Sequence, residues 1–275
     1  MTQVWFITGA NRGIGAHVAR AALQAGHRVV ATGRKLDQLR AAYPETDKVL
    51  LAELDVTRPD QAEAAVQAAL ERFGRIDVLV NNAGYGLLGN FEEIDAQAIE
   101  AQFATNVFGL MHVTRAVLPV MRRQRSGHIF NLSSVGGALG FEGAAVYCAT
   151  KYAVEGLSAS LSPELARFGI HVTAVEPGFF RTDFLDGSSV HYGSKVIDDY
   201  GSGAVKAQYD AYSHRQPGDP ARLGAALVQL AGMSAPPKQF VAGSDALGMV
   251  SGALEGRLDE IRAFATLTAS LDGDA

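Results

Sequence analysis

Three residues suited to proton transfer lie close together in this sequence. Tyr147 and Lys151 are four residues apart in a segment with a helical pattern, and Ser134 precedes the tyrosine by thirteen positions. Residues four apart share one face of a helix, so the phenol and the ammonium group would be neighbours. A neighbouring cation stabilises the phenolate and lowers the phenol pKa from about 10. Reaching about 7 takes roughly 4 kcal/mol, and such a tyrosine exchanges protons with an alcohol or a carbonyl at neutral pH.

A glycine-rich turn follows the first apolar segment of the chain. Its glycines allow the backbone to approach a pyrophosphate, and the following helix offers unpaired N–H groups and a positive dipole end to the anion. The spacing Gly-x-x-x-Gly-x-Gly differs from the commoner Gly-x-Gly-x-x-Gly, and an ordinary glycine-rich turn is the alternative. The strand–turn–helix context predicts dinucleotide binding. The turn consists of Thr8, Gly9, Ala10, Asn11, Arg12, Gly13, Ile14 and Gly15.

Apolar segments alternate with helical patterns along most of the chain. Continuously apolar strands separated by helices indicate a parallel sheet covered on both faces. Right-handed crossovers then give a doubly wound α/β fold of the Rossmann type, whose ligands bind beyond the carboxyl ends of the strands. We expect one domain over residues 1–275. The expected strands are residues 4–7, 28–31, 49–52, 78–80, 128–132, 171–175 and 239–241, and the main expected helices are residues 13–25, 59–73, 146–168 and 219–231.

Two segments depart from this alternation. Residues 178–218 lack a regular pattern and combine glycines and serines with seven aromatic residues. A long irregular segment in a compact domain is usually functional or mobile. Residues 246–275 form a C-terminal extension that is predicted to be helical as far as about residue 267.

Composition excludes several classes of protein. Of the 275 residues, 48% are hydrophobic. The formal net charge is -5, and this negative charge argues against a nucleic-acid partner. No segment is long enough to cross a membrane, and none has the pattern of a signal peptide. The single cysteine, Cys148, rules out an internal disulfide and suits a reducing cytoplasm. The seven histidines lack metal-binding spacing, so we expect no metal site.

Taken together, the motifs resemble those of the short-chain dehydrogenase/reductase family. The resemblance covers about residues 3–182, in the family's order. It implies that Tyr147 is the general acid in carbonyl reduction and the general base in alcohol oxidation, and that Lys151 lowers its pKa and holds the nicotinamide ribose. The motifs are the glycine turn, Asn81-Asn82-Ala83-Gly84, Asn106, Ser134, Tyr147-x-x-x-Lys151 and Pro177-Gly178.

The resemblance also implies two supporting catalytic roles. Ser134 would donate a hydrogen bond to the substrate oxygen, where negative charge grows. Ser133 is the alternative, but the thirteen-residue separation from Tyr147 favours Ser134. Asn106 would maintain a bend in its helix and hold a water molecule that links Lys151 to solvent.

The family distinguishes its cofactors at the end of the second strand. An acidic residue there would bind the ribose 2′-OH of NAD and repel a 2′-phosphate. Here Gly33 takes that place, Arg34 and Lys35 follow, and Arg12 lies in the nearby turn. Two guanidinium groups without a carboxylate suit a phosphate, so we predict NADP(H) over NAD(H), although Arg34 and Lys35 could simply begin a solvated helix. Further cofactor contacts implied by the resemblance are Asp55 and Val56 at the adenine, Asn82, Ala83 and Gly84 beside the adenosine ribose, and Pro177, Gly178 and Thr182 near the nicotinamide.

The predicted function is NADPH-dependent, reversible reduction of a ketone or aldehyde. Oxidation of a hydroxysteroid or another secondary alcohol is an alternative, and a catalytically silent NADP sensor is a remote one. The aromatic segment 178–218 would form a lid over an apolar substrate, or its rings could anchor the segment to the body. We expect a homo-oligomer, a dimer rather than a tetramer. The small residues Ala149, Ala153, Gly156 and Ser160 permit close helix packing, which fits a subunit interface as well as the core, and the resemblance implies pairing through this helix.

Overall fold

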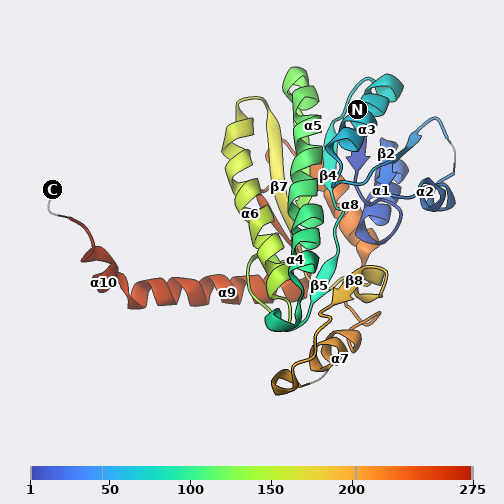
Figure 1. Ribbon diagram of the computed structural model, residues 1–275. Helices are drawn as coiled ribbons and strands as arrows, with labels where there is room; N and C mark the ends of the chain where they lie inside the picture. The colour runs from blue at the N-terminus through green and yellow to red at the C-terminus, as the bar shows by residue number, and fades with distance from the viewer. Residues whose placement is uncertain (1, 45, 202, 274–275) are drawn as a thin grey trace.

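The computed structural model describes residues 2–44, 46–201 and 203–273. Its centre is a seven-stranded sheet in the order β3-β2-β1-β4-β6-β7-β9, and every neighbouring pair is parallel (Figure 1). This is the doubly wound arrangement that the sequence predicts. The strands are β1 (Val4–Ile7), β2 (Arg28–Gly33), β3 (Val49–Glu53), β4 (Val78–Asn81), β6 (Gly127–Leu132), β7 (Ile170–Pro177) and β9 (Gln239–Ala242).

The sheet separates two apolar cores because successive strand residues point to opposite faces. In β1, Val4 and Phe6 join one core, whereas Trp5 and Ile7 join the other. The first core is covered by α3 (Pro59–Phe73), α5 (Leu110–Gln124) and α6 (Ala145–Ala166). The second core is covered by α1 (Gly13–Gln24), α2 (Leu36–Ala42) and α8 (Pro220–Ala231).

Helix ends lie within two residues of the predicted positions because proline and glycine mark them. The helix α3 begins at Pro59 and is capped by Gly74, whose φ of 78° is the left-handed conformation that glycine adopts without strain. The helix α6 is one residue longer at its start and two residues shorter at its end than predicted. Between α4 (Ala96–Phe103) and α5, the π-helical segment η2 (Ala104–Gly109) interrupts the regular helix.

Residues 178–218 contain short helices and a strand that sequence patterns do not predict. Strand β8 (Val190–Tyr192) pairs in parallel with β5 (Gly86–Leu88), away from the main sheet. Three residues are too few for a recognisable period, so sequence patterns predicted neither strand. The remaining elements of the segment are η4 (Asp183–Leu185), η5 (Asp198–Tyr200) and α7 (Ala204–Asp210), and the chain also forms η1 (Phe91–Glu93) and η3 (Val135–Gly137).

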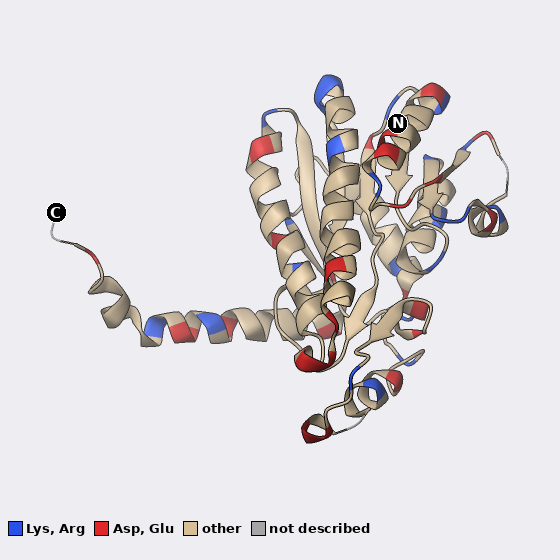
Figure 2. Ribbon diagram, viewed as in Figure 1, with Lys and Arg blue, Asp and Glu red and all other residues tan. Residues whose placement is uncertain are grey.

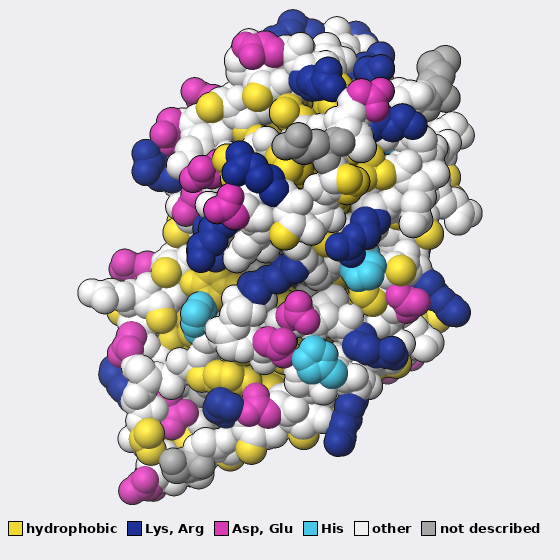
Figure 3. All heavy atoms as spheres, turned by 90° about the vertical axis from the view of Figure 1, so that its right-hand side faces the viewer, with side chains coloured by type: hydrophobic (Ala, Val, Ile, Leu, Met, Phe, Trp, Pro, Cys, Tyr) yellow, Lys and Arg dark blue, Asp and Glu magenta, His cyan; other side chains and the backbone are white. Residues whose placement is uncertain are grey.

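The C-terminal helices leave the body of the protein. Figure 1 shows α9 (Ser244–Ala263) emerging beneath α6 and projecting past it, with α10 (Ala265–Ala269) beyond. In the part of the chain that the structure describes, no helix combines the length and the hydropathy that a membrane span needs. Figures 2 and 3 show acidic and basic residues interspersed rather than gathered in one basic stripe over the faces in view.

Candidate active site

The predicted site segments meet at the carboxyl edge of the sheet. The glycine turn follows β1, Asn82 follows β4, Ser134 follows β6 and Gly178 follows β7. Parallel neighbouring strands end at the same edge, which brings these segments together although they are far apart in the sequence.

The glycine turn is braced by the segment after β4. The Thr8 hydroxyl oxygen accepts hydrogen bonds from the main-chain N–H groups of Asn82 and Ala83, both at 2.9 Å. In return, the Asn82 amide donates to the main-chain oxygens of Thr8 at 2.9 Å and Gly9 at 3.0 Å. A Cβ on Gly15 would lie 2.4 Å from that amide nitrogen, so only glycine fits there.

The same turn has the form of an anion cradle. Gly9 and Gly13 have φ values of 62° and 56°, which L side chains rarely adopt. Gly13 lies close to residues 178–218, the segment predicted to form a lid and called the lid below, because its Cβ position would be 3.9 Å from the Thr182 Cβ. The half-buried Ile14 packs against the second core and fixes the start of α1. These features fit the pyrophosphate of a dinucleotide, whose negative charge the N-terminus of α1 would attract.

Tyr147 and Ser134 form the centre of the site. Burial raises the pKa of Tyr147 to about 12, and a hydrogen bond with the Ser134 side chain acts in the opposite direction. The Ser134 hydroxyl also accepts from the Gly136 N–H at 3.1 Å. Ser133 instead is buried and its hydroxyl points toward the main-chain oxygen of Lys151, at 3.5 Å. Of the two serines, it is Ser134 that lies at the phenol.

Lys151 lies beside Tyr147 but does not act on it as expected. Its Nζ is 5.6 Å from the centre of the tyrosine ring and donates to the main-chain oxygen of Leu132 at 2.7 Å. Burial lowers the pKa of Lys151 to about 8, against the charge of Glu155, which raises it. The expectation of a lowered tyrosine pKa is therefore wrong for this geometry, because burial of the phenol is the largest influence on its pKa, and the hydrogen bond with Ser134 rather than the Lys151 ammonium group opposes it.

Asn106 lies in the π-helical segment η2 and connects two parts of the site. Its amide oxygen accepts from the Tyr85 N–H at 3.1 Å, and its amide nitrogen donates to the Tyr85 main-chain oxygen at 3.0 Å. The same nitrogen donates to the Thr150 hydroxyl at 3.2 Å, one residue before Lys151. A Cβ on Gly84 would lie 3.1 Å from the Asn106 Oδ1. The predicted interruption of the helix is thus present, and π-helical turns of this kind are frequent at functional sites.

Of the residues predicted to select the cofactor, Arg12 is hydrogen-bonded to another part of the protein, whereas Arg34 and Lys35 are exposed. The Arg12 guanidinium donates to the hydroxyl and the main-chain oxygen of Ser188, both at 2.5 Å, so the lid engages it. Arg34 and Lys35 are exposed at the start of α2, and the Arg34 charge lowers the pKa of Tyr85 against the larger effect of burial. The predicted pair of phosphate-binding arginines is therefore reduced to Arg34 in this conformation.

Three other predicted cofactor contacts take part in local structure. One Asp55 oxygen accepts from the N–H and the hydroxyl of Thr57, at 3.0 and 2.7 Å, and so closes a turn. Val56 is buried against Gly109, and Asn11 donates to the Gln38 side chain at 3.0 Å. These residues shape the edge of the site.

Sequence reasoning missed the role of Asp245. Its carboxylate accepts from the Phe179 N–H at 2.8 Å, and a Cβ on Gly178 would lie 2.5 Å from both of its oxygens. The carboxylate thereby fixes the turn after Pro177. Sequence patterns do not predict this contact, because sixty-six residues separate Phe179 from Asp245. The one available signal was that Asp245 follows closely after the last strand.

Aromatic side chains of the lid pack directly on the site. The ring of Phe184 lies 5.6 Å from that of Tyr147, and Phe179 stacks on Tyr212 at 5.8 Å. Thr182 caps η4 by accepting from the Phe184 N–H at 3.3 Å. The lid core also contains Cys148, which packs as expected, together with Leu88, Ala144, Leu185, Val190 and Val205. Phe184 thus borders the phenol of Tyr147, while Tyr200 and Tyr212 remain 44% and 52% exposed.

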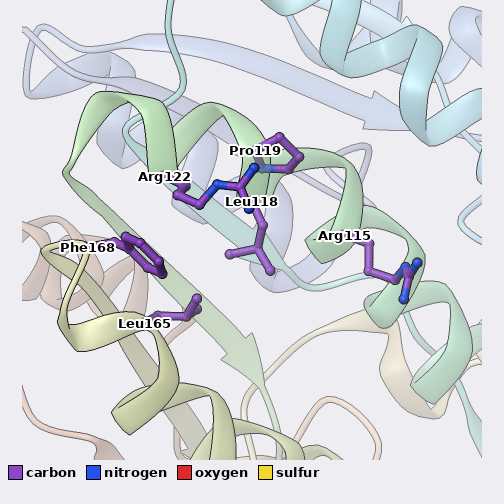
Figure 4. Close-up of a pocket in the computed structure, with 6 residues that line it drawn as sticks. All are labelled: Arg115, Leu118, Pro119, Arg122, Leu165 and Phe168. Carbon is purple, nitrogen blue, oxygen red and sulfur yellow. The ribbon is translucent and has the colours of Figure 1, made fainter.

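Two further features lie outside this site. Figure 4 shows a hollow of about 250 Å³ between the C-terminal halves of α5 and α6, lined by Arg115, Leu118, Pro119, Arg122, Leu165 and Phe168. It lies at the end of the sheet opposite the catalytic edge. On the lid, Asp183, Asp186 and His214 come within reach of one another, which sequence spacing did not predict. His214 and Asp186 form an ordinary hydrogen-bonded pair at 3.1 Å, and we assign no ion to this exposed group.

Comparison with known proteins establishes the family. The family model described as short chain dehydrogenase matches residues 3–192. Oxidoreductase BOA17 of Botryotinia fuckeliana is 40% identical over 259 residues, which cover 93% of this chain and 94% of that protein. The 3-ketodihydrosphingosine reductase of Bacteroides thetaiotaomicron is 35% identical, with 86% of each chain covered. A short-chain dehydrogenase from Streptomyces avermitilis has a similar structure, with a TM-score of 0.90, 36% identity and coverage of 99% of this chain and 100% of that chain. The chain belongs to the short-chain dehydrogenase/reductase family and is an NAD(P)-dependent oxidoreductase.

Similar structures with bound cofactor point to a nicotinamide dinucleotide. A serine dehydrogenase complexed with NADP+ aligns with a TM-score of 0.75 and 29% identity, covering 86% of this chain and 93% of that one. A 3-ketoacyl-(acyl-carrier-protein) reductase from Brucella melitensis, complexed with NADH, aligns with a TM-score of 0.76 and 25% identity, covering 89% of this chain and 98% of that one.

Proposed function

We propose that this protein reduces a ketone or aldehyde to an alcohol with NADPH, and that Tyr147 donates the proton. The observation that carries the proposal is the meeting of Ser134, Tyr147 and Lys151 at the same edge of the sheet as the glycine turn. A bound nicotinamide would supply the hydride. The residues of the chain then have to bind the carbonyl, orient it and deliver a proton to its oxygen.

The high pKa of Tyr147 favours the direction of reduction. A phenol with a pKa of about 12 is protonated at neutral pH, as a proton donor must be. Ser134 can donate a second hydrogen bond to the carbonyl oxygen as negative charge develops on it. Lys151 is mostly protonated at pH 7, because its pKa of about 8 lies above that value, and its ammonium group favours an oxyanion nearby.

The preference for NADPH rests on charge at the end of β2. Gly33 offers no carboxylate to a 2′-phosphate, and the exposed Arg34 offers a cation. Asp55, Val56, Asn82, Ala83 and Gly84 would surround the adenosine half, and Gly178 and Thr182 the nicotinamide half. The buried Cys148 is compatible with a reducing cytoplasm, which we propose as the location.

The substrate would be a bulky, largely apolar carbonyl compound under a lid formed by residues 178–218. Phe184 contacts Tyr147, and the lid core beside it is made of aliphatic and aromatic side chains. One relative is named for reduction of a keto lipid, which is compatible with a substrate of this class.

A ketone panel with NADPH, followed by the absorbance of the cofactor, tests this proposal. Tyr147→Phe should lower kcat/KM at least about 100-fold, in line with the loss of a general acid, while NADPH affinity stays within about threefold. The matched control is Tyr152→Phe, which removes an exposed phenol from the same helix and should leave turnover unchanged. More than a few per cent of wild-type turnover in Tyr147→Phe would refute the assignment of the proton donor.

A further inference from the structure

The C-terminal arm, defined here as α9 and α10 (Ser244–Ala269), is attached to the body only at its beginning. Ala246 and Val250 are buried against Val135, and Met249 packs beside them. From Leu254 to Gly273, every described residue is exposed. Figure 1 shows this outer part of the arm extending away from the body.

One face of the arm is apolar and has no partner among the residues that the structure describes. Leu247, Leu254, Leu258 and Ile261 are between 49% and 61% exposed. Their spacing of three, four and seven residues places them in one stripe along α9, the pattern of a helix that packs on another surface. Phe264, Leu267 and Leu271 continue the exposed apolar surface, at 62%, 63% and 79%.

The arm cannot rely on its own sequence for stability. Gly248, Gly252 and Gly256 recur every four residues inside α9, and a Cβ on any of them would meet no atom within 4 Å. Glycine weakens a helix interior, and helices in water take most of their stability from packing of an apolar face. Such a helix is stabilised when another surface covers its apolar stripe.

Charge argues that this surface belongs to a protein rather than to a lipid bilayer. The residues from Ser244 to Gly273 include five acidic side chains against two basic ones, a net charge of -3. Figure 2 shows both signs along the outer half of α9. Helices that lie on anionic membranes are rich in lysine and arginine instead.

The position of the arm favours a second copy of this chain. The outer face of α6 is exposed at Ala149, Tyr152, Gly156 and Ser160, and a Cβ on Gly156 would meet no atom within 4 Å. Small side chains let another backbone approach closely. The arm leaves the body beneath α6 and projects past it, so a copy seated on α6 lies where the arm extends (Figure 1).

We propose that the arm of each copy packs its Leu254–Leu258–Ile261 stripe against α6 of a second copy, and so holds a symmetric homodimer together. The seven exposed apolar side chains offer on the order of 700 Å², close to the roughly 800 Å² per partner of a stable interface. Two-fold symmetry makes the contact twice, once in each direction. The proposal gives the dimer expected from the sequence a specific contact, and it does not depend on catalysis.

Sedimentation of the full-length chain at 1–50 µM tests the proposal by mass. The wild type should have twice the chain mass of 29.0 kDa. Leu254→Glu combined with Leu258→Glu should weaken the dimer at least 100-fold, and the variant chain should still unfold cooperatively, because both positions are exposed in the single chain. Ala263→Glu adds a charge to the opposite face of the same helix and should change the dimer constant less than threefold.

Cross-linking identifies the receiving surface. A photoreactive benzoyl-phenylalanine in place of Leu258, in a mixture of isotopically light and heavy chains, should give inter-chain cross-links to residues of α6. Four results would each overturn the proposal: a wild-type monomer at 50 µM, an intact dimer in the double glutamate variant, cross-links that avoid α6, or co-sedimentation of the full-length chain with anionic lipid vesicles.

Discussion

The Arg12 guanidinium reaches from the glycine turn to the lid, where it donates to the hydroxyl and the main-chain oxygen of Ser188. The residue thus joins the two parts of the site that would lie on either side of a bound dinucleotide. Gly13, next in the chain, also approaches the lid at Thr182. We therefore expect cofactor binding and the position of residues 178–218 to be linked through Arg12.

Removal of the Arg12 side chain should loosen the lid. Hydrogen bonds of this kind contribute about 1 kcal/mol, so amides of residues 186–192 should exchange with solvent roughly fivefold faster in Arg12→Ala. Hydrogen exchange followed by mass spectrometry measures the effect. Arg34→Ala, which removes a guanidinium without a contact to the lid, should leave exchange unchanged; equal acceleration in both variants would contradict the link.

Arg34 should carry the discrimination between the two dinucleotides. Arg34→Ala should raise the dissociation constant of NADPH about tenfold, equivalent to about 1.4 kcal/mol, because a charge-assisted contact to the 2′-phosphate is lost. Affinity for NADH should stay within twofold. Gly33→Asp is sterically tolerable, since its Cβ would lie 3.5 Å from the Asn11 Oδ1, and it should shift the preference further toward NADH. Isothermal calorimetry measures the dissociation constants of both cofactors. Equal losses of affinity for NADPH and NADH would exclude a contact between Arg34 and the 2′-phosphate.

The pH dependence of reduction should follow Lys151 rather than Tyr147. The pKa of Lys151 is lowered to about 8 by burial, so its positive charge is lost as the pH rises through 8. Tyr147, with a pKa of about 12, keeps its proton over that range. We expect kcat for reduction to fall above pH 8, and Lys151→Arg to be less active at pH 7 but nearly independent of pH up to about 10. A wild-type profile that is flat to pH 10 would contradict this assignment.

The sequence predicts the sheet and the site segments well because both depend on local signals. Apolar runs mark the strands, and residues such as Pro59 and Gly74 mark helix ends within one turn. Motif positions at strand ends then converge by topology alone. The seven strands and the placement of Ser134 against Tyr147 follow from these signals.

Features set by tertiary contacts were not predictable. The pairing of β5 with β8 joins segments about one hundred residues apart, and each is only three residues long. The partners of Arg12 and Asp245 depend on the path of the lid and of the last turn. The direction of the Tyr147 pKa shift was predicted wrongly. The spacing of Tyr147 and Lys151 shows which charge is near, but it does not show how far burial removes the phenol from water.

The buried carboxyl group of Glu176 should make the protein less stable at alkaline pH. Glu176 is 2% exposed, and its Oε2 has no hydrogen-bond partner among the described residues. Burial, followed by the charge of Glu155, raises the pKa of Glu176 to about 7 from the usual 4.5. The folded state therefore binds more protons than the unfolded state between about pH 4.5 and 7, and the free energy of unfolding should fall as the pH rises through this range.

Glu176→Gln should remove most of that dependence, because the amide imitates the neutral carboxyl group. At pH 8 the variant should be more stable than the wild type by about 2 kcal/mol, and at pH 4.5 the two should be nearly equal. Urea unfolding at both pH values measures the difference. Glu164→Gln, an exposed substitution on α6, should change stability by less than about 0.5 kcal/mol at either pH. A Glu176→Gln protein less stable than the wild type at pH 8 would show that the ionised carboxylate is compensated in the folded state.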